Sequence, residues 1–351
     1  MFLPARSGTS GPEERPRDSA IGESDWHVLA GFWHPVAFAH ELADRPLAAR
    51  LLDVPLVLWR TAAGVHAARD LCPHRGARLS AGWVRDGQLV CPMHGLHYAG
   101  DGACTRIPSI PDPAPPIPPK LRLATYRCVE HLGLVWVCLK EQPIWPLPHW
   151  DGIADPALKK VAMPVFAWRS SAARHLENFN DVAHFPWVHG GSFGAPGEAV
   201  MPHYEVRQEP YGLSFAFPYR EGVNRFPDAA GAGLDRRDVV YTYELTYPFA
   251  TLIKVAPVGS DFVHYFADAA SPVSATECRI FQICTDTTGD PDPDYWIRDS
   301  LAIVVEDQPL VEAQPPFLPL DLRQEIHIPA DRLSLAWRRG LVERFGMGGG
   351  T

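Results

Sequence analysis

The sequence of 351 residues has no long hydrophobic run and no long basic stretch. No apolar segment reaches the roughly 18 residues that a membrane-spanning helix needs, and residues 1–25 lack the apolar core of a secretory signal. A formal net charge of −9 argues against nucleic acid or an anionic membrane as the main partner. We therefore expect a cytoplasmic, folded protein that begins with a flexible tail over residues 1–25.

Several cofactor and disulfide patterns are also missing. No G-x-G-x-x-G motif follows a predicted strand, which argues against a bound NAD or flavin. A plant-type C-x4-C-x2-C set is absent as well. The seven cysteines are an odd number, so a complete disulfide framework is not expected. The cysteines and the 15 histidines are therefore candidates for metal ligands in a reducing compartment.

The length predicts two domains at about 150 residues each. Short apolar segments bounded by glycine, aspartate or proline predict a small all-β domain over residues 26–142. A proline-rich stretch at residues 143–149 is typical of a linker, and residues 143–351 form the second predicted domain. Helices are expected there at residues 172–180 and 292–313, with alternating antiparallel strands between them. The predicted fold class is α+β.

Four candidate metal ligands lie within 23 residues of the first domain, as Cys72-Pro-His74 and Cys91-Pro-Met-His94. Zinc sites of the Cys2His2 type usually take two cysteines from one loop and two histidines from another. Here each loop supplies one cysteine and one histidine. This mixed pairing suits a Rieske [2Fe–2S] cluster, in which two cysteines hold one iron and two histidines hold the other. A structural zinc site is the weaker alternative, and we interpret the nearby His97 as a partly exposed loop residue.

A second candidate site lies around His184 and His189, which are five residues apart with Pro186 between them. Two histidines and one carboxylate form the facial triad of non-haem Fe(II) oxygenases, which leaves positions open for O2. The carboxylate has to come from elsewhere, and the adjacent Glu306 and Asp307 of the predicted late helix are the candidates. The histidine pair alone is a weak signal, because core histidines occur at the same spacing.

Together, the two clusters resemble the large (α) subunit of Rieske non-haem iron ring-hydroxylating oxygenases over about residues 26–340. The resemblance rests on the C-x-H and C-x2-H loops, on an N-x2-D-x2-H-x4-H motif beginning at Asn178, and on the late segment VVEDQPLVEAQ. It implies an N-terminal all-β Rieske [2Fe-2S] domain. A helix-grip (START-like) catalytic domain with a curved antiparallel sheet is implied to follow.

The resemblance also implies roles for individual residues. Asp307 would be the third iron ligand beside His184 and His189, with Glu306 as the alternative. Asp181 would bridge the two centres by accepting hydrogen bonds from His184 and from the cluster ligand His94 of the next subunit in a head-to-tail homotrimer. Asn178 would line the iron site without ligating the metal. Two further sets of candidates are a basic docking patch (Arg75, Arg78, Arg85) and a substrate pocket (Phe179, Trp187, Phe193, Tyr204, Phe215, Phe217, Tyr247, Ile253, Phe281).

The function implied is that of a terminal oxygenase. Electrons from NAD(P)H would arrive through a separate reductase, with or without a ferredoxin, and O2 would be the co-substrate at a mononuclear Fe(II). The single chain of modest length resembles the monooxygenase and demethylase branch, which hydroxylates or oxidatively demethylates ring-containing small molecules. The alternatives are a Rieske electron-transfer protein without catalysis, a desaturating or cyclising oxygenase of natural-product metabolism, and a zinc-bound interaction module.

Overall fold

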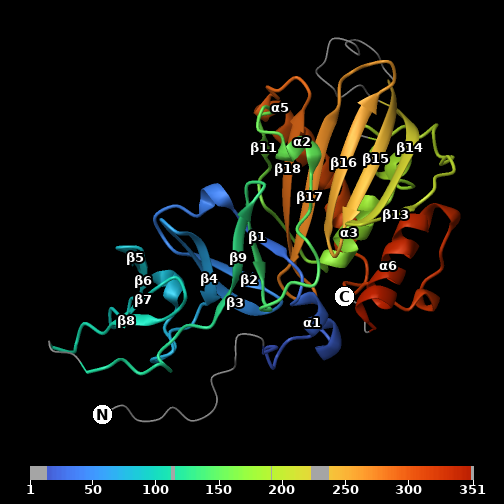
Figure 1. Cartoon of the computed structure of the whole chain (residues 1–351). Coiled ribbons are helices and arrows are strands. Elements are labelled where there is room, and N and C mark those ends of the chain that lie inside the picture. The colour runs from blue at the N-terminus through green and yellow to red at the C-terminus, as the bar shows by residue number, and fades with distance from the viewer. Residues whose placement is uncertain (1–13, 112–114, 191, 223–236, 349–351) are drawn as a thin grey trace. The chain divides into compact units, whose positions relative to one another are not determined.

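The computed structural model describes residues 14–111, 115–190, 192–222 and 237–348 (Figure 1). The chain divides into two compact units, residues 1–144 and 145–351. Part of the predicted tail is structured, because helix α1 (Glu23–Leu29) begins before Trp26. The Trp26 side chain is fully buried and its indole N–H donates to the Leu52 carbonyl at 2.8 Å, which fixes this early start. Residues 1–13 of that tail lie outside the described part.

The first unit is built from two antiparallel sheets. The larger has the strand order β1-β10-β9-β4-β3-β2, and the smaller has the order β5-β6-β7-β8. Every pairing in both sheets is antiparallel. The strands are β1 (His34–Phe38), β2 (Leu47–Leu51), β3 (Val54–Thr61), β4 (Gly64–Arg69), β5 (Trp83–Arg85), β6 (Gln88–Val90), β7 (His97–Tyr98), β8 (Cys104–Arg106), β9 (Thr125–His131) and β10 (Leu134–Cys138).

The second unit contains one long antiparallel sheet with the order β11-β18-β17-β16-β15-β14-β13, and β12 also pairs with β18. Strand β14 alternates buried and exposed residues over most of its length, as expected for a sheet with one covered face. The strands are β11 (Val161–Ala162), β12 (Phe166–Trp168), β13 (Arg207–Glu209), β14 (Gly212–Glu221), β15 (Arg237–Thr246), β16 (Ala250–Pro257), β17 (His264–Pro272) and β18 (Cys278–Asp286).

Five α-helices accompany this sheet in the described part of the second unit: α2 (Asp151–Ala154), α3 (Ala172–Asn180), α4 (Phe185–Val188), α5 (Pro293–Glu312) and α6 (Arg332–Phe345). The sequence predicts α3 and α5 at these positions. Their starts have a physical cause, because Ser171 and Asp292 accept backbone N–H groups of the first turns as N-caps. Helix α3 packs against strand β17 and helix α5. Among the described residues, no helix is both long enough and apolar enough to cross a membrane.

Candidate metal centres

The two Cys/His loops of the first unit have the same backbone geometry. In each, the glycine four residues after the cysteine donates its N–H to the cysteine carbonyl, from Gly76 to Cys72 at 2.8 Å and from Gly95 to Cys91 at 3.0 Å. Both glycines have positive φ, 77° and 66°, a conformation that a side chain would strain. The loops therefore form two matched tight turns that begin at the cysteines.

Burial separates the four predicted ligands into an inner and an outer pair. Cys72 and Cys91 are buried, whereas His74 and His94 are exposed and their rings lie 4.6 Å apart. Burial raises the pKa of the Cys72 thiol, although a hydrogen bond with the Tyr98 hydroxyl, 3.3 Å from Sγ, opposes the shift. Two inner sulfurs and two outer imidazoles fit a cluster with one thiolate-bound and one imidazole-bound iron.

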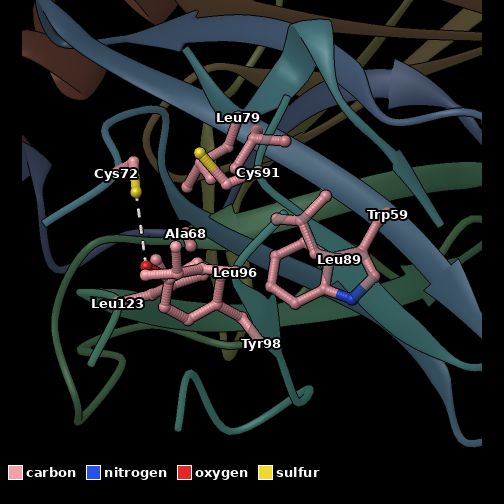
Figure 2. Packing of buried hydrophobic residues seen from close by; sticks show 10 residues of the cluster. Trp59, Ala68, Cys72, Leu79, Leu89, Cys91, Leu96, Tyr98 and Leu123 are labelled. Carbon is pink, nitrogen blue, oxygen red and sulfur yellow. Dashed lines mark hydrogen bonds between the residues drawn. The ribbon is translucent and has the colours of Figure 1, made fainter. Parts of the chain in front are cut away.

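A small apolar core supports the two cysteines. Figure 2 shows the Cys72 sulfur pointing at the Tyr98 hydroxyl, whereas Leu89 and the indole of Trp59 are seen on the other side of the Tyr98 ring. These side chains belong to one buried cluster drawn from both sheets of the unit. Its members are Val57, Trp59, Ala68, Cys72, Leu79, Leu89, Cys91, Leu96, Tyr98 and Leu123. Dry packing of this kind excludes water from the sulfur side of the loops.

The interpretation of His97 as a loop residue is wrong. His97 lies on strand β7, is only 6% exposed, and its Nδ1 lies 3.1 Å from the Gln88 Oε1. The hydrogen bond with Gln88 engages the ring within the small sheet.

All seven cysteines are free. Burial raises the pKa of Cys128 to about 12, so this side chain stays a neutral thiol.

In the second unit, side chains that are distant in sequence converge at one point. Ligand atoms of His184, His189 and Asp307 all lie within 4.8 Å of one another, and no other group of three His, Cys, Asp or Glu does so in the described part of the chain. The two Nε2 atoms are 3.0 Å apart, and Asp307 Oδ1 lies 3.6 Å from that of His184 and 3.5 Å from that of His189. Asp307 Oδ1 is buried and accepts no hydrogen bond from the described residues. A cation among these three atoms would satisfy it, so the site fits a mononuclear iron.

A carboxylate fixes the orientation of each imidazole. His184 Nδ1 donates to Asp181 Oδ2 at 3.0 Å, and His189 Nδ1 donates to Glu306 Oε2 at 2.9 Å. A carboxylate only accepts hydrogen bonds, so both rings carry their proton on Nδ1 and turn a lone pair on Nε2 toward Asp307. The Glu306 carboxylate also accepts a hydrogen bond of 2.7 Å from the Ser192 hydroxyl. The structure thus places Glu306 behind His189 and not among the converging ligand atoms.

The four-residue helix α4 separates the two histidines, and the Asp181 carboxylate precedes it. Helix α3 ends at Asn180, and the Asp181 carboxylate then accepts the N–H groups of Ala183 and His184 at 3.0 and 3.2 Å. Helix α4 follows with Pro186 in its first turn, where a proline is tolerated. Burial alone would raise the pKa of Asp181, but the hydrogen bonds and charge of the His184 ring, with these N–H groups, hold it below its usual value. For His189, burial lowers the pKa although Asp307 and Glu306 oppose it.

A largely apolar cavity opens beside the converging ligands, with about 730 Å³ of empty space, part of it open to solvent. Asn178 lines it, as do the predicted pocket residues Phe179, Phe193 and Ile253. Trp187 is 71% exposed. The other predicted pocket residues are buried in the core and do not belong to the described cavity wall: Tyr204, Phe215, Phe217, Tyr247 and Phe281.

Comparisons with known proteins cover both units. Residues 32–127 match the Rieske [2Fe-2S] domain, and residues 168–344 match the vanillate O-demethylase oxygenase C-terminal domain. The chain is 32% identical to methylxanthine N1-demethylase NdmA of Pseudomonas putida, over 93% of this chain and 92% of the relative. It is 30% identical to methylxanthine N3-demethylase NdmB of the same organism, over 90% and 89%.

Solved structures agree with this assignment. NdmA of Pseudomonas putida with caffeine superposes with a TM-score of 0.80 at 29% identity, covering 91% of this chain and 92% of the other. Dicamba monooxygenase bound to dicamba shares the fold, with a TM-score of 0.74 at 23% identity over 91% and 97%. The predicted α+β fold, with an all-β Rieske domain and a second domain built on an antiparallel sheet, is confirmed.

The predicted activity class and cofactors are confirmed as well. The Rieske [2Fe-2S] domain followed by an oxygenase C-terminal domain implies a Rieske cluster, a mononuclear iron, O2 and electrons from a partner reductase. An electron carrier without catalysis would account only for the first unit, whereas the match extends through the second. The chain is a terminal oxygenase component and belongs to the family of Rieske non-haem iron oxygenases.

Proposed function

We propose that this oxygenase removes a methyl group oxidatively from a nitrogen or oxygen atom of a ring-containing small molecule. The observation that carries the proposal is the convergence of two Nε2 atoms and a buried, unpaired carboxylate oxygen beside a mostly apolar cavity. Methylated rings fit a cavity whose wall is mainly apolar and carries polar groups at particular points. The similarity to two methylxanthine demethylases over about nine-tenths of each chain favours demethylation over ring hydroxylation.

In this proposal the site residues divide into three groups. Cys72, His74, Cys91 and His94 hold the cluster; His184, His189 and Asp307 hold the iron; and Asp181 and Asn178 complete the catalytic site. The bound metal centres supply electron transfer and O2 activation for oxidation of a substrate C–H bond. The protein contributes the orientation of the ligands, since Asp181 and Glu306 hold the Nδ1 protons of the two imidazoles. The apolar cavity wall holds the ring and excludes bulk water.

We also propose a head-to-tail homotrimer in which the cluster of one subunit serves the iron of its neighbour. The side chain of Asp181 is 31% exposed, so an imidazole N–H of a second chain can reach it. His94 is exposed on its loop next to Met93, which is 62% exposed. Asp181 and the 96% exposed Ile326 line one groove of the second unit. An apolar residue beside each polar partner suits a docking contact between copies of this chain.

The partner reductase or ferredoxin needs a docking surface on the first unit. Arg75, Arg78 and Arg85 are exposed near the cluster loops, and we propose them as a basic patch for an acidic electron donor. The seven free cysteines suit a reducing compartment, which supports a cytoplasmic location.

The test uses the cluster- and iron-loaded protein with NADH, a compatible reductase and a panel of N-methylated and O-methylated ring compounds. We expect substrate-dependent O2 uptake and release of formaldehyde. In His184→Ala, iron should fall from about three to two per chain and turnover should stop, while the visible spectrum of the cluster survives. Turnover that persists in this variant would contradict the iron assignment, and a hydroxylated product without formaldehyde would replace demethylation by hydroxylation.

A further inference from the structure

A chain of four buried polar side chains crosses the wall of the cavity, apart from the iron ligands. They come from helix α3, strands β17 and β18, and helix α5, and they are His175, Asp268, Gln282 and Ser300. Asp268 is fully buried and the other three are at most 5% exposed. His175, Gln282 and Ser300 line the cavity, whereas Asp268 lies behind them. None of these four side chains is a predicted ligand of the iron or of the cluster.

The hydrogen bonds fix the direction of each group. His175 Nε2 donates to Asp268 Oδ1 at 3.0 Å, and Gln282 Nε2 donates to Asp268 Oδ2 at 2.9 Å. The Ser300 hydroxyl donates to Gln282 Oε1 at 3.1 Å. Because the Asp268 carboxylate can only accept, the amide of Gln282 cannot flip and Nε2 of the His175 ring carries a hydrogen.

Three hydrogen-bonding positions are left over after these contacts. They are the second amide N–H of Gln282, the second lone pair of its carbonyl oxygen, and Nδ1 of His175. That Nδ1 is buried and has no hydrogen-bond partner among the described residues. A buried polar atom without a hydrogen-bond partner destabilises the protein. A ligand that supplies the missing partner removes this penalty and therefore binds more tightly. The rest of the wall is mainly apolar and aromatic.

We propose that the His175–Asp268–Gln282–Ser300 chain is the polar recognition element of this cavity. It selects ring substrates that carry an N–H or O–H donor next to a carbonyl or ether oxygen, over analogues in which that donor is methylated. The fixed amide of Gln282 complements such an edge with one donor and one acceptor. The proposal rests on the proposed function, because it names the class of methylated ring that the iron site would oxidise.

Two pairs of compounds test this selectivity, since the members of each pair differ in a single donor. Theobromine has a ring N–H where caffeine has a methyl group, and 4-hydroxy-3-methoxybenzoate has a hydroxyl where 3,4-dimethoxybenzoate has a second methoxy group. Dissociation constants are measured calorimetrically on the metal-loaded protein without O2. We expect the wild type to bind the donor-bearing member of at least one pair about 10- to 100-fold more tightly.

Gln282→Leu replaces the amide by an apolar side chain of similar size. The dissociation constants of the two members of that pair should therefore become nearly equal. Ser300→Ala releases the amide from its fixed orientation and should reduce the ratio part of the way; it also serves if Gln282→Leu does not fold. The control is Ile253→Ala in the apolar wall. It should weaken both members by the same factor and leave their ratio unchanged.

The outcomes separate this inference from the proposed function. A wild-type protein that binds the members of both pairs equally, or binds neither pair, contradicts the recognition element. A binding ratio that neither Gln282→Leu nor Ser300→Ala changes also contradicts the recognition element. The four polar side chains would then only hold helix α3, the sheet and helix α5 together. Selective binding without formaldehyde release from any of the four compounds would contradict demethylation and leave the recognition element standing.

Discussion

Each histidine at the proposed iron site has its own carboxylate, and the two carboxylates differ in what else they contact. Asp181 accepts backbone N–H groups and is 31% exposed, which leaves it accessible to a second chain. Glu306 is 20% exposed and accepts from the Ser192 hydroxyl. We infer that Glu306 serves only to position His189, whereas Asp181 is also exposed enough to accept a hydrogen bond from a second chain in the proposed trimer.

Removal of Glu306 should therefore affect iron binding specifically. We expect Glu306→Ala to weaken Fe(II) affinity by about 10- to 100-fold, because His189 loses the acceptor that fixes its ring. Glu306→Gln keeps an acceptor for Nδ1 and should have a smaller effect. Affinity is measured by competition with a chelator, and the cluster absorbance of the same samples serves as the control. Iron affinity equal to that of the wild type in Glu306→Ala would show that Glu306 does not position the ligand.

His34 on strand β1 makes the stability of the protein depend on pH. Its ring is buried, it donates to the Leu29 carbonyl at 2.9 Å, and burial lowers its pKa from 6.5 to about 4. Between these values the unfolded chain binds a proton that the folded chain does not. The contribution of His34 to the free energy of unfolding is therefore fully present above pH 6.5 and is lost as the pH falls toward 4.

This residue alone should cost about 2 kcal/mol of unfolding free energy between pH 7 and pH 5. His34→Gln retains an N–H donor for Leu29 but does not titrate in this range. The difference between wild type and variant is measured by urea denaturation at both pH values on metal-loaded protein. Equal losses in the two proteins would show that the His34 ring is not the source of the pH dependence.

Site residues could be predicted from the sequence where they lie only a few positions apart along the chain. The C-x-H and C-x2-H loops and the H-x4-H turn are each formed within a few positions of the chain. The contact between His175 and Asp268 spans 93 positions, and that between His189 and Glu306 spans 117. The first pair joins helix α3 to strand β17 and the second joins the residue after helix α4 to helix α5, and no local pattern encodes such contacts. The adjacent Glu306 and Asp307 show the limit, because the structure was needed to assign their different contacts.

At the scale of elements, helix α6 was not predicted, because its apolar pattern is interrupted. Its buried face consists of Leu333, Trp337 and Leu341, but also of Arg338, which is only 2% exposed. An arginine on the inner face interrupts the kind of apolar spacing that predicts helix α5. It is buried because Glu177 and Glu325 accept hydrogen bonds from its guanidinium, the latter at 2.7 Å. The same two carboxylates pair with Arg174 on helix α3, so one ionic network joins the two helices.

Breaking this network should destabilise the second unit. Arg338→Leu leaves two partly buried carboxylates with one guanidinium, and we expect it to lower the free energy of unfolding by about 3 kcal/mol. Arg323→Ala is the matched control, because it removes an exposed ion pair with Asp321, and we expect no measurable change. Both are measured by thermal denaturation of metal-loaded protein. A melting temperature of Arg338→Leu equal to that of the control would contradict a stabilising role of the network.

At the scale of the whole molecule, each centre lies within one of the two units, and the proposed trimer makes them cooperate between chains. A variant without a cluster (His94→Ala) and a variant without iron (His184→Ala) should each be inactive alone. When the two are co-expressed in equal amounts, about a quarter of the subunit contacts join an intact cluster to an intact iron site. We expect about a quarter of the wild-type turnover. Electron transfer within single chains would give none, because no chain contains both centres.

The position of Asp181 makes this experiment directional. Asp181 accepts a hydrogen bond from His184 of its own chain, so in the proposed trimer the bridge belongs to the chain that receives the electron. Asp181→Asn added to the His94→Ala chain should therefore abolish the recovered turnover. The same change in the His184→Ala chain should have no effect, because that chain only donates electrons. Trimer formation is checked by light scattering in every mixture. Equal loss from both placements would show that Asp181 supports the trimer and not the transfer of electrons.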